Sequence, residues 1–326
     1  MTNILIVVVV ILLVATLVQI LRVSELLSEI KNKDVNEVTD KDNNTQGLLF
    51  LIVGFGFLIF VVWQMITWNH LLLPPASSVH GTQIDLLMKV SMGLIIVVFF
   101  ITSPMLFYFV YKYRGKKSNK AYFLSHNNKL EVVWTVIPTI ILTALIIFGL
   151  KTWDKAMNVE ISESTKVIEV YGQQFNWTAR YSGLDNNLGK ANYKLVKGRN
   201  TLGIDMLDPH AADDKMAREV HLVIDQPVLL KFRSQDVIHS AFLPHFRVQM
   251  NCVPGMTTQF GFTPTKTTAQ MKESEGEDFE YILLCNKICG AAHYNMQMKF
   301  IVETQEEYDI WLASQKNLEI ILLTQK

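Results

Sequence analysis

Hydrophobic residues are concentrated in four long runs in the first half of the chain. Each run holds 18 to 22 residues and no charged side chain, and the runs are Ile4–Leu21, Gly47–Trp68, Val90–Tyr111 and Val132–Leu150. A helix needs about 20 apolar residues to cross the hydrocarbon core of a bilayer. A buried core helix explains one such run, but not four of them in one half of a chain. We therefore predict about four transmembrane helices.

The distribution of basic residues predicts how these helices are oriented. Six Lys and Arg side chains lie in the segment Lys112–Lys129, whereas the loop Asn69–Asp85 carries none. Because Lys and Arg are enriched in cytoplasmic loops, we place the first segment inside and the second outside. The first run must then be a retained span, since a cleaved secretion signal at Ile4–Leu21 would put the Lys-rich segment outside. The chain after the fourth run lies outside the cytoplasm.

The pattern changes after Leu150. Short runs of alternating apolar and polar residues are separated by Gly, Pro, Asn and Asp, and they include Lys166–Tyr171, Glu219–Ile224, Val228–Phe232, Gln259–Phe262, Glu280–Leu284 and Gln297–Val302. This pattern is typical of a β-sandwich or barrel. Near the end of the chain, Thr304 and Glu307 form the signature of a capping box, which predicts a short C-terminal helix.

These patterns divide the chain into three predicted regions. Residues 1–46 form an N-terminal membrane span and an inside linker, and residues 47–151 form three transmembrane helices. Residues 152–326 form an extracytoplasmic all-β domain with a short C-terminal helix.

Composition excludes several classes of protein. Half of the 326 residues are hydrophobic and 18% are charged, whereas average soluble domains carry about 25% charged residues. The high apolar content excludes a disordered chain. Thirty Lys and Arg side chains are balanced by thirty Asp and Glu, so we expect no nucleic-acid partner. Three cysteines are too few for a disulfide scaffold.

The candidate chemistry lies in the segment Cys285–Met296. Two thiols, an imidazole and a thioether lie in this segment, at Cys285, Cys289, His293 and Met296. Soft sulfur ligands with imidazole favour copper, and zinc, the nearest rival, does not usually take a thioether ligand. Gly290 allows a tight turn that folds the ligands around one point. A disulfide between Cys285 and Cys289 is the alternative in an extracytoplasmic domain, and the spacing alone does not exclude it.

The pattern Cys285-x3-Cys289-Gly-x2-His293-x2-Met296 resembles the binuclear copper (CuA) motif of cytochrome c oxidase subunit II. Further segments resemble that family in the same order along the chain, namely Glu131–Pro138, Tyr171–Trp177, Asp236–Ser240 and Val253–Gly255. The resemblance covers residues from about 86 to 316. It implies a cupredoxin-like Greek-key domain that follows a transmembrane hairpin made of the last two spans.

The resemblance also implies a ligand set for two copper ions. The implied ligands are the bridging thiolates of Cys285 and Cys289, the imidazoles of His239 and His293, the thioether of Met296 and the backbone carbonyl of Lys287. The implied function is electron entry into a respiratory oxidase. Single electrons would come from a c-type cytochrome and pass to haem in the catalytic subunit I, coupled to dioxygen reduction and proton pumping. Haems are therefore expected only in partner subunits.

Three further positions take their interpretation from the resemblance. Glu131 matches the carboxylate at the entrance of a proton pathway, although a carboxylate at a membrane boundary is otherwise an interfacial anchor. Phe175 stands where the family commonly has an exposed tryptophan for electron entry. The alternative is that Phe175 and Trp177 are strand core residues. Lys287 replaces a Glu that usually reaches a magnesium or manganese ion, and a protonated lysine offers no lone pair, so we expect this boundary metal site to be absent or changed.

The main alternative function is a membrane-anchored copper chaperone for oxidase assembly. Such proteins also use a Cys-x3-Cys pair and a distant His, but they typically show a thioredoxin-like βαβ pattern and one span, which this sequence lacks. Residues 152–326 carry 22 acidic and 18 basic side chains, a balance that suits a basic cytochrome. A tethered donor or a supercomplex fits equally well.

The expected location is the inner membrane of a bacterium, with the copper domain on the periplasmic side. The expected partners are subunit I, other oxidase subunits and the lipid bilayer. The first two spans have no counterpart in the family's usual hairpin. Gly54-Phe-Gly56 in the second span predicts a smooth patch for packing against another subunit.

Overall fold

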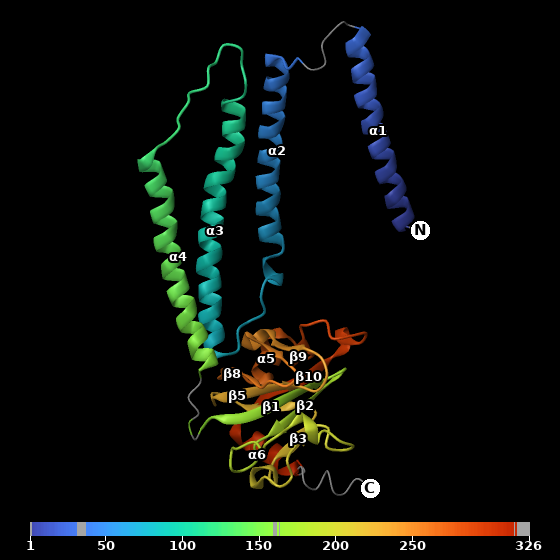
Figure 1. Cartoon of the computed structure of the whole chain (residues 1–326), viewed down its shortest axis with the longest axis vertical. Coiled ribbons are helices and arrows are strands. Elements are labelled where there is room, and N and C mark those ends of the chain that lie inside the picture. The colour runs from blue at the N-terminus through green and yellow to red at the C-terminus, as the bar shows by residue number, and fades with distance from the viewer. Residues whose placement is uncertain (1, 31–36, 159–161, 163, 316, 318–326) are drawn as a thin grey trace. The chain divides into compact units, whose positions relative to one another are not determined.

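The computed structural model describes residues 2–30, 37–158, 162, 164–315 and 317. These residues form two compact units (Figure 1). One unit consists of Met1–Asn69 and Ile95–Asn127, and the other of His70–Leu94 and Asn128–Lys326. The three predicted regions of the sequence are not tested by this grouping, because the third helix belongs to both units.

Four long helices contain the four apolar runs. The helices are α1 (Thr2–Ile30), α2 (Asp40–Thr67), α3 (Val79–Lys112) and α4 (Asn128–Met157). All four are long and apolar enough to cross a membrane. Most of their described large apolar side chains are exposed, as expected of helices that face lipid or other membrane subunits. The prediction of four spans is confirmed, and each helix extends beyond the charge-free run that predicted it.

In the first unit, α2 packs against the second half of α3. Gly54 lies directly against the ring of Phe107, so that a Cβ atom added to Gly54 would be 2.2 Å from Cγ of Phe107. Phe57 meets the rings of Phe99 and Phe107 edge-on. Gly56, in contrast, has nothing within 4 Å of such an added atom. Of the two glycines predicted to form a patch for another subunit, Gly54 therefore packs within the chain itself.

The second unit contains two five-stranded sheets. The first has the order β3-β2-β1-β5-β8 and the second has the order β4-β10-β9-β6-β7. The strands are β1 (Lys166–Gln173), β2 (Asn176–Tyr181), β3 (Lys215–Ala217), β4 (Val220–Val223), β5 (Val228–Ser234), β6 (His239–Leu243), β7 (Val248–Cys252), β8 (Thr258–Phe262), β9 (Tyr281–Cys285) and β10 (Gln297–Glu303). The pairs β1–β5 and β4–β10 are parallel, and the other pairs are antiparallel.

Two short α-helices complete this domain. Helix α5 covers Thr268–Glu275, and α6 covers Gln305–Ser314. Thr304 caps α6 through the predicted capping box with Glu307. The prediction of an all-β, cupredoxin-like domain with a short C-terminal helix is confirmed.

Apolar side chains from both sheets form a shared core. The largest fully buried members include Trp177, Phe232, Phe246, Tyr281 and Phe300. Alternating residues of each strand contribute to this core, because successive side chains of a strand point to opposite faces. The core gives the copper-motif residues a rigid base.

A separate group of charged side chains is also buried, apart from the half-buried Arg233, and we call it the charged cluster. Its members are Glu169, Arg180, Asp214 and Arg233. Arg180 pairs with Glu169 at 2.7 Å and with Asp214 at 2.8 Å, and Arg233 also pairs with Glu169. Burial opposes ionisation of Glu169, but the two arginines outweigh it and hold the pKa of Glu169 below its usual value. For Asp214, burial outweighs the attraction of Arg180 and raises the pKa to about 6.

Candidate metal centre

Strand pairing in the second sheet brings the first two candidate ligands together. His239 is the first residue of β6, and Cys285 is the last residue of β9. These strands are antiparallel, with Ala241 paired to Cys285. The beginning of one antiparallel strand lies beside the end of its neighbour. The fold therefore places His239 next to Cys285, although 45 residues separate them in the sequence.

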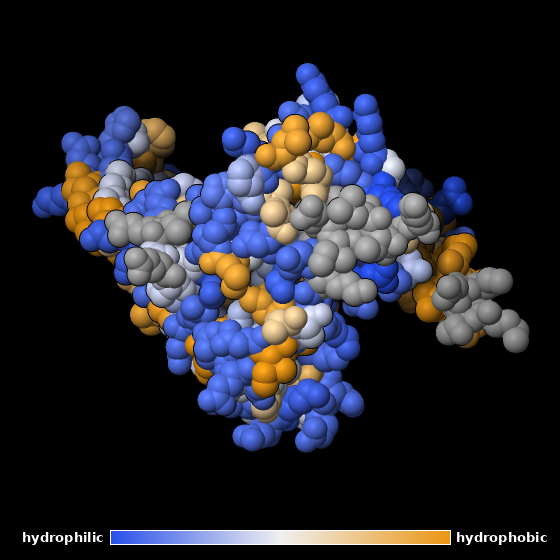
Figure 2. Space-filling view, turned by 90° about the horizontal axis from the view of Figure 1, so that it is seen from below, coloured by the Kyte–Doolittle hydropathy of each residue, from blue (hydrophilic) through white to orange (hydrophobic). Residues whose placement is uncertain are grey.

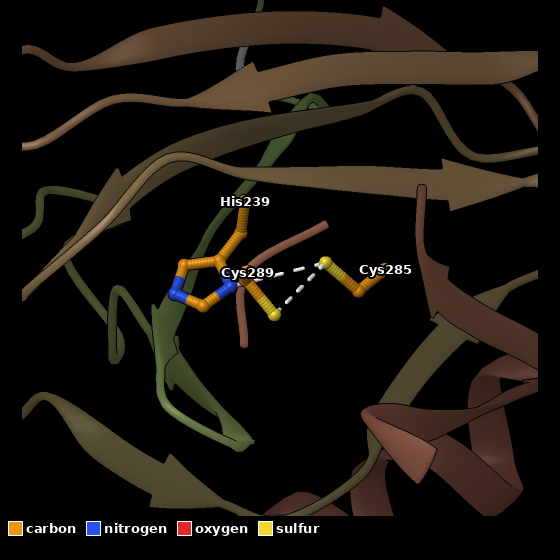
Figure 3. Close-up of side chains that lie close together, drawn as sticks. All are labelled: His239, Cys285 and Cys289. Atoms are coloured by element: carbon orange, nitrogen blue, oxygen red, sulfur yellow. Dashed lines mark hydrogen bonds between the residues drawn. The ribbon is translucent and has the colours of Figure 1, made fainter. Parts of the chain in front are cut away.

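The three central side chains face one another (Figure 3). Sγ of Cys285 lies 3.8 Å from Nδ1 of His239 and 3.8 Å from Sγ of Cys289. The ligand atoms of these three residues all lie within 4.8 Å of one another, and all three residues are buried. Both cysteines are free, and their sulfur separation greatly exceeds the roughly 2.05 Å of a disulfide bond. The structure therefore does not contain the alternative disulfide.

The remaining predicted ligands surround this centre. Sγ of Cys289 lies 3.6 Å from Nδ1 of His293 and 3.8 Å from Sδ of Met296. Sγ of Cys285 lies 3.3 Å from the backbone carbonyl oxygen of Lys287. All six residues predicted as ligands thus come together, and we call them the metal-ligand cluster. Gly290 has a φ of +146°, a backbone conformation that favours glycine, and it turns the chain between Cys289 and His293.

A carboxylate orients the most buried imidazole. Nε2 of His239 lies 2.9 Å from Oδ1 of Asp236. A histidine that binds a metal commonly gives its other ring nitrogen to a carboxylate, and this contact leaves Nδ1 of His239 for the centre. Burial opposes ionisation of Asp236, but hydrogen bonds from the backbone of Gln174 and from His239 outweigh it and hold the pKa of Asp236 below its usual value.

Aromatic packing holds the same imidazole from another side. The ring of Trp177 meets the ring of His239 edge-on at 5.8 Å, and its indole N–H donates to the carbonyl of Met296 at 3.4 Å. A Cβ atom added to Gly172 would lie 3.1 Å from Cδ2 of His239. No larger residue fits at Gly172 without displacing the neighbouring rings. Trp177 is therefore a brace of the centre, almost fully buried.

The donor set fits a soft cation. Two thiols and a thioether with two imidazoles match the preference of copper, and they exceed the usual ligand set of zinc. Burial, reinforced by the neighbouring Cys285, raises the pKa of the Cys289 thiol to about 11. A thiol binds a metal as the thiolate, so binding at this centre releases protons. The third cysteine, Cys252, is a fully buried core residue, and burial raises the pKa of its thiol to about 12.

The other predicted site residues occupy distinct places. Phe175 is 36% exposed, and a Cβ atom added to Gly290 would lie 2.7 Å from its Cζ. Phe175 therefore reaches from the surface to the loop that carries Cys289. Glu131 is half-buried in the first turn of α4 and lies outside the metal-ligand cluster. The side chain of Lys287 is exposed, and only its carbonyl faces the centre.

Two residues near the centre were not predicted to have a role of their own. Asp236 was part of a segment that resembles the oxidase family, and its position three residues before His239 was the available signal. Gln174 likewise lies in a segment that resembles the family, Tyr171–Trp177, but its contacts with Asp236 and Cys289 arise only through the folded turn between β1 and β2.

Two family models match the chain. Residues 63–152 match the model described as "Cytochrome C oxidase subunit II, transmembrane domain". Residues 166–304 match the model described as "Cytochrome C oxidase subunit II, periplasmic domain". The first match begins near the end of α2, and the second spans all ten strands and every residue of the metal-ligand cluster.

Individual relatives carry the same description. The alternative cytochrome c oxidase subunit 2 of Bradyrhizobium diazoefficiens is 32% identical over 273 residues, which are 82% of this chain and 91% of that protein. The cytochrome c oxidase subunit 2 of Synechocystis sp. is 25% identical over 288 residues, 82% of each chain. That of Cereibacter sphaeroides is 26% identical over 251 residues, 73% of this chain and 78% of the relative.

Proposed function

This chain belongs to the cytochrome c oxidase subunit II family, and from that premise we propose that it is the electron-entry subunit of a respiratory haem–copper oxidase. The observation that carries the proposal is the convergence of six donor groups on one buried point. An oxidase subunit of this family has an electron-transfer role, and a centre whose three central residues are buried suits that role. Two copper ions bound there would supply a one-electron carrier.

The protein's own contribution is to hold the ligands still. The ions would be held by the six groups of the metal-ligand cluster, namely Cys285, Cys289, His239, His293, Met296 and the carbonyl of Lys287. Asp236 and Trp177 fix the ring of His239 on two sides. Electron transfer is fast where ligand positions change little between oxidation states, and a braced site in a packed β-domain meets that requirement.

Electron entry is proposed to occur beside Phe175. This ring is partly exposed and packs on Gly290, the residue after Cys289. A c-type cytochrome that docks over Phe175 would deliver single electrons to the Cys289 loop. Trp177 is almost fully buried, and its part in this route is to brace His239.

The proposed partners, proton pathway and location of this chain are those expected of its family. The proposed electron acceptor is haem in subunit I, where dioxygen is reduced, and Glu131 is the proposed entrance of a proton pathway. The proposed location is the inner membrane of a bacterium, with the copper domain on the periplasmic side. Because Lys287 presents its side chain outward and only its carbonyl to the centre, we propose that no magnesium or manganese ion is held by this position.

A copper chaperone for oxidase assembly is not favoured. Copper transfer requires an accessible site that releases its ion, whereas the two cysteines, His239 and Met296 are buried. The family of the chain and its four long apolar helices also differ from those expected of a chaperone.

Spectroscopy of the intact complex tests the proposal. The complex is purified through this chain, and its copper content, electron paramagnetic resonance (EPR) spectrum and near-infrared absorption are recorded. We expect two copper ions per chain and a mixed-valence signal from one electron shared by both. A single-copper signal, with an ion that passes readily to an acceptor protein, would instead support the chaperone.

A further inference from the structure

Gln174 contacts both the segment that precedes His239 and the loop that carries Cys289. It lies in the turn between β1 and β2, in the first sheet, whereas Cys289 follows β9 in the second sheet. The backbone N–H of Gln174 donates to Oδ2 of Asp236 at 2.7 Å. Its side-chain amide donates to the backbone carbonyl of Cys289 at 2.6 Å. One residue thus uses both its main chain and its side chain to contact the surroundings of the centre.

The contacts of Asp236 extend this connection to His239. The other carboxylate oxygen of Asp236 lies 2.9 Å from Nε2 of His239 and accepts from the backbone N–H of Val237 at 2.7 Å. A continuous series of hydrogen bonds therefore runs from Cys289 through Gln174 and Asp236 to His239. Both ends of the series lie beside Cys285, whose Sγ is 3.8 Å from Sγ of Cys289 and 3.8 Å from Nδ1 of His239. The hydrogen bonds and the two contacts of Cys285 therefore form a continuous ring that passes through Cys289, Gln174, Asp236, His239 and Cys285.

The position demands a side chain that can donate a hydrogen bond. A carbonyl oxygen such as that of Cys289 accepts only from a donor group, and the amide of Gln174 supplies one. Gln174 and Gly290 are exposed, but the amide of Gln174 lies close to the Cys289 loop, because a Cβ atom added to Gly290 would lie 2.9 Å from Nε2 of Gln174. A shift of the Cys289 loop would therefore break the bond or collide with its donor.

We propose that Gln174 is a positioning residue that keeps the Cys289 loop and His239 at a fixed separation around the copper ions. The inference rests on the proposed function and adds to it a third element of the fold, the β1–β2 turn. Gln174 touches neither ion and acts through the carbonyl of Cys289 and the carboxylate of Asp236. Its loss would loosen the ligand set without removing a ligand.

The test replaces Gln174 in the intact oxidase complex. Gln174→Leu keeps a side chain of similar size and removes the donor. Gln173→Leu is the matched control, because the adjacent Gln173 is half-buried and its side chain makes no hydrogen bond among the described residues. Outer partners of metal ligands are typically worth about 10- to 100-fold in metal affinity. We expect Gln174→Leu to lose copper to a strong chelator about 10-fold faster or more, and to change the copper hyperfine pattern, whereas the control matches the wild type.

A second pair of variants tests whether the contacts act as one unit. Asp236→Asn and the double variant with Gln174→Leu complete a double-mutant cycle. Residues in one hydrogen-bond network give non-additive effects, so we expect the double variant to lose copper no faster than the worse single variant. If Gln174→Leu does not assemble, Gln174→Glu provides the same test, since an ionised carboxylate cannot donate to the Cys289 carbonyl.

The experiment distinguishes failure of the positioning role of Gln174 from failure of the proposed function. If Gln174→Leu and Gln173→Leu keep the same copper-loss rate and the same EPR spectrum as the wild type, the positioning role of Gln174 is overturned. If the wild-type complex itself lacks the mixed-valence copper signal, the proposed function fails before Gln174 is tested.

Discussion

The β-domain contains two groups of mostly buried polar side chains that differ in the charges they bring together. In the charged cluster, opposite charges meet at 2.7 and 2.8 Å around Arg180. In the metal-ligand cluster, sulfur and nitrogen atoms that share the same preference for a cation face one another at 3.6 to 3.8 Å. The first group brings opposite charges together, although Oδ1 of Asp214 is buried there without a hydrogen-bond partner, whereas the second group brings together only groups that prefer to bind a cation. Burial alone therefore does not indicate a functional site. A set of buried side chains that all prefer to bind a cation does indicate one.

The strongest test of this difference removes one member of the metal-ligand cluster. Cys285→Ser is expected to abolish the mixed-valence copper signal, because a serine hydroxyl does not replace a bridging thiolate, while the domain stays folded. Copper content, EPR and circular dichroism of the purified complex measure both results. Cys252→Ala is the control, since Cys252 is a core residue and its loss leaves the copper signal in place. A normal signal in Cys285→Ser would contradict the assigned ligand set.

The corresponding change in the charged cluster should affect folding. Glu169→Gln leaves Arg180 and Arg233 without their shared carboxylate, and breaking a buried ion pair typically costs about 3–5 kcal/mol. Denaturant unfolding of the protein in detergent is expected to show this loss, with an unchanged copper spectrum in the folded fraction. The control is Glu280→Gln, which breaks the exposed pair with Lys299 and is expected to cost much less, because exposed ion pairs contribute little to stability. Equal losses in both variants would remove the distinction between the two pairs.

A smaller effect on the free energy of unfolding is expected from the titration of Asp214. Burial raises the pKa of Asp214 in the folded protein to about 6, above the usual 3.8 of the carboxyl, so the folded protein holds a proton that the unfolded chain releases in this interval. The stability contribution is therefore fully present below about pH 4 and is lost as the pH rises through 6, by up to about 3 kcal/mol. Asp214→Asn removes this titration. The free energy of unfolding of the wild type, minus that of the variant, should fall by up to about 3 kcal/mol from pH 4 to pH 7, and a constant difference would count against the raised pKa.

The smallest expected effect concerns a carboxylate outside both clusters. Glu131→Gln is predicted to slow turnover of the oxidase several-fold, because a proton donor at the proposed pathway entrance is removed. The copper content, EPR spectrum and stability should stay at wild-type values, which separates this variant from the two cluster variants. Unchanged proton-coupled turnover would refute the assignment of Glu131.

The parts of the fold that were predictable depend on local patterns. Four apolar runs indicated four spans, and short alternating runs indicated β-strands, because both signals arise within about 20 residues or fewer. The packing partner of Gly54 was not predictable, because Gly54 and Gly56 differ only in which face of α2 they occupy. The opposing ring of Phe107 belongs to another helix, and no local pattern identifies it.

The candidate site was also predictable only where its residues lie close together in the sequence. Four candidate ligands lie within Cys285–Met296, so their spacing alone indicated a soft metal. His239 lies far away in the sequence and was identified only through the family resemblance. Gln174 was missed, because its contacts with Asp236 and Cys289 arise where the β1–β2 turn meets two other loops. A function that depends on the meeting of three loops leaves no trace in the spacing of any one of them.

The carbonyl of Lys287 has a consequence for how this site can evolve. It faces Cys285 at 3.3 Å, and every amino acid offers the same main-chain oxygen. A substitution of Lys287 leaves this oxygen in place, so selection at position 287 acts on the outward side chain alone. The surface next to the metal-ligand cluster can therefore acquire a new charge in a single step that keeps the main-chain contact with Cys285.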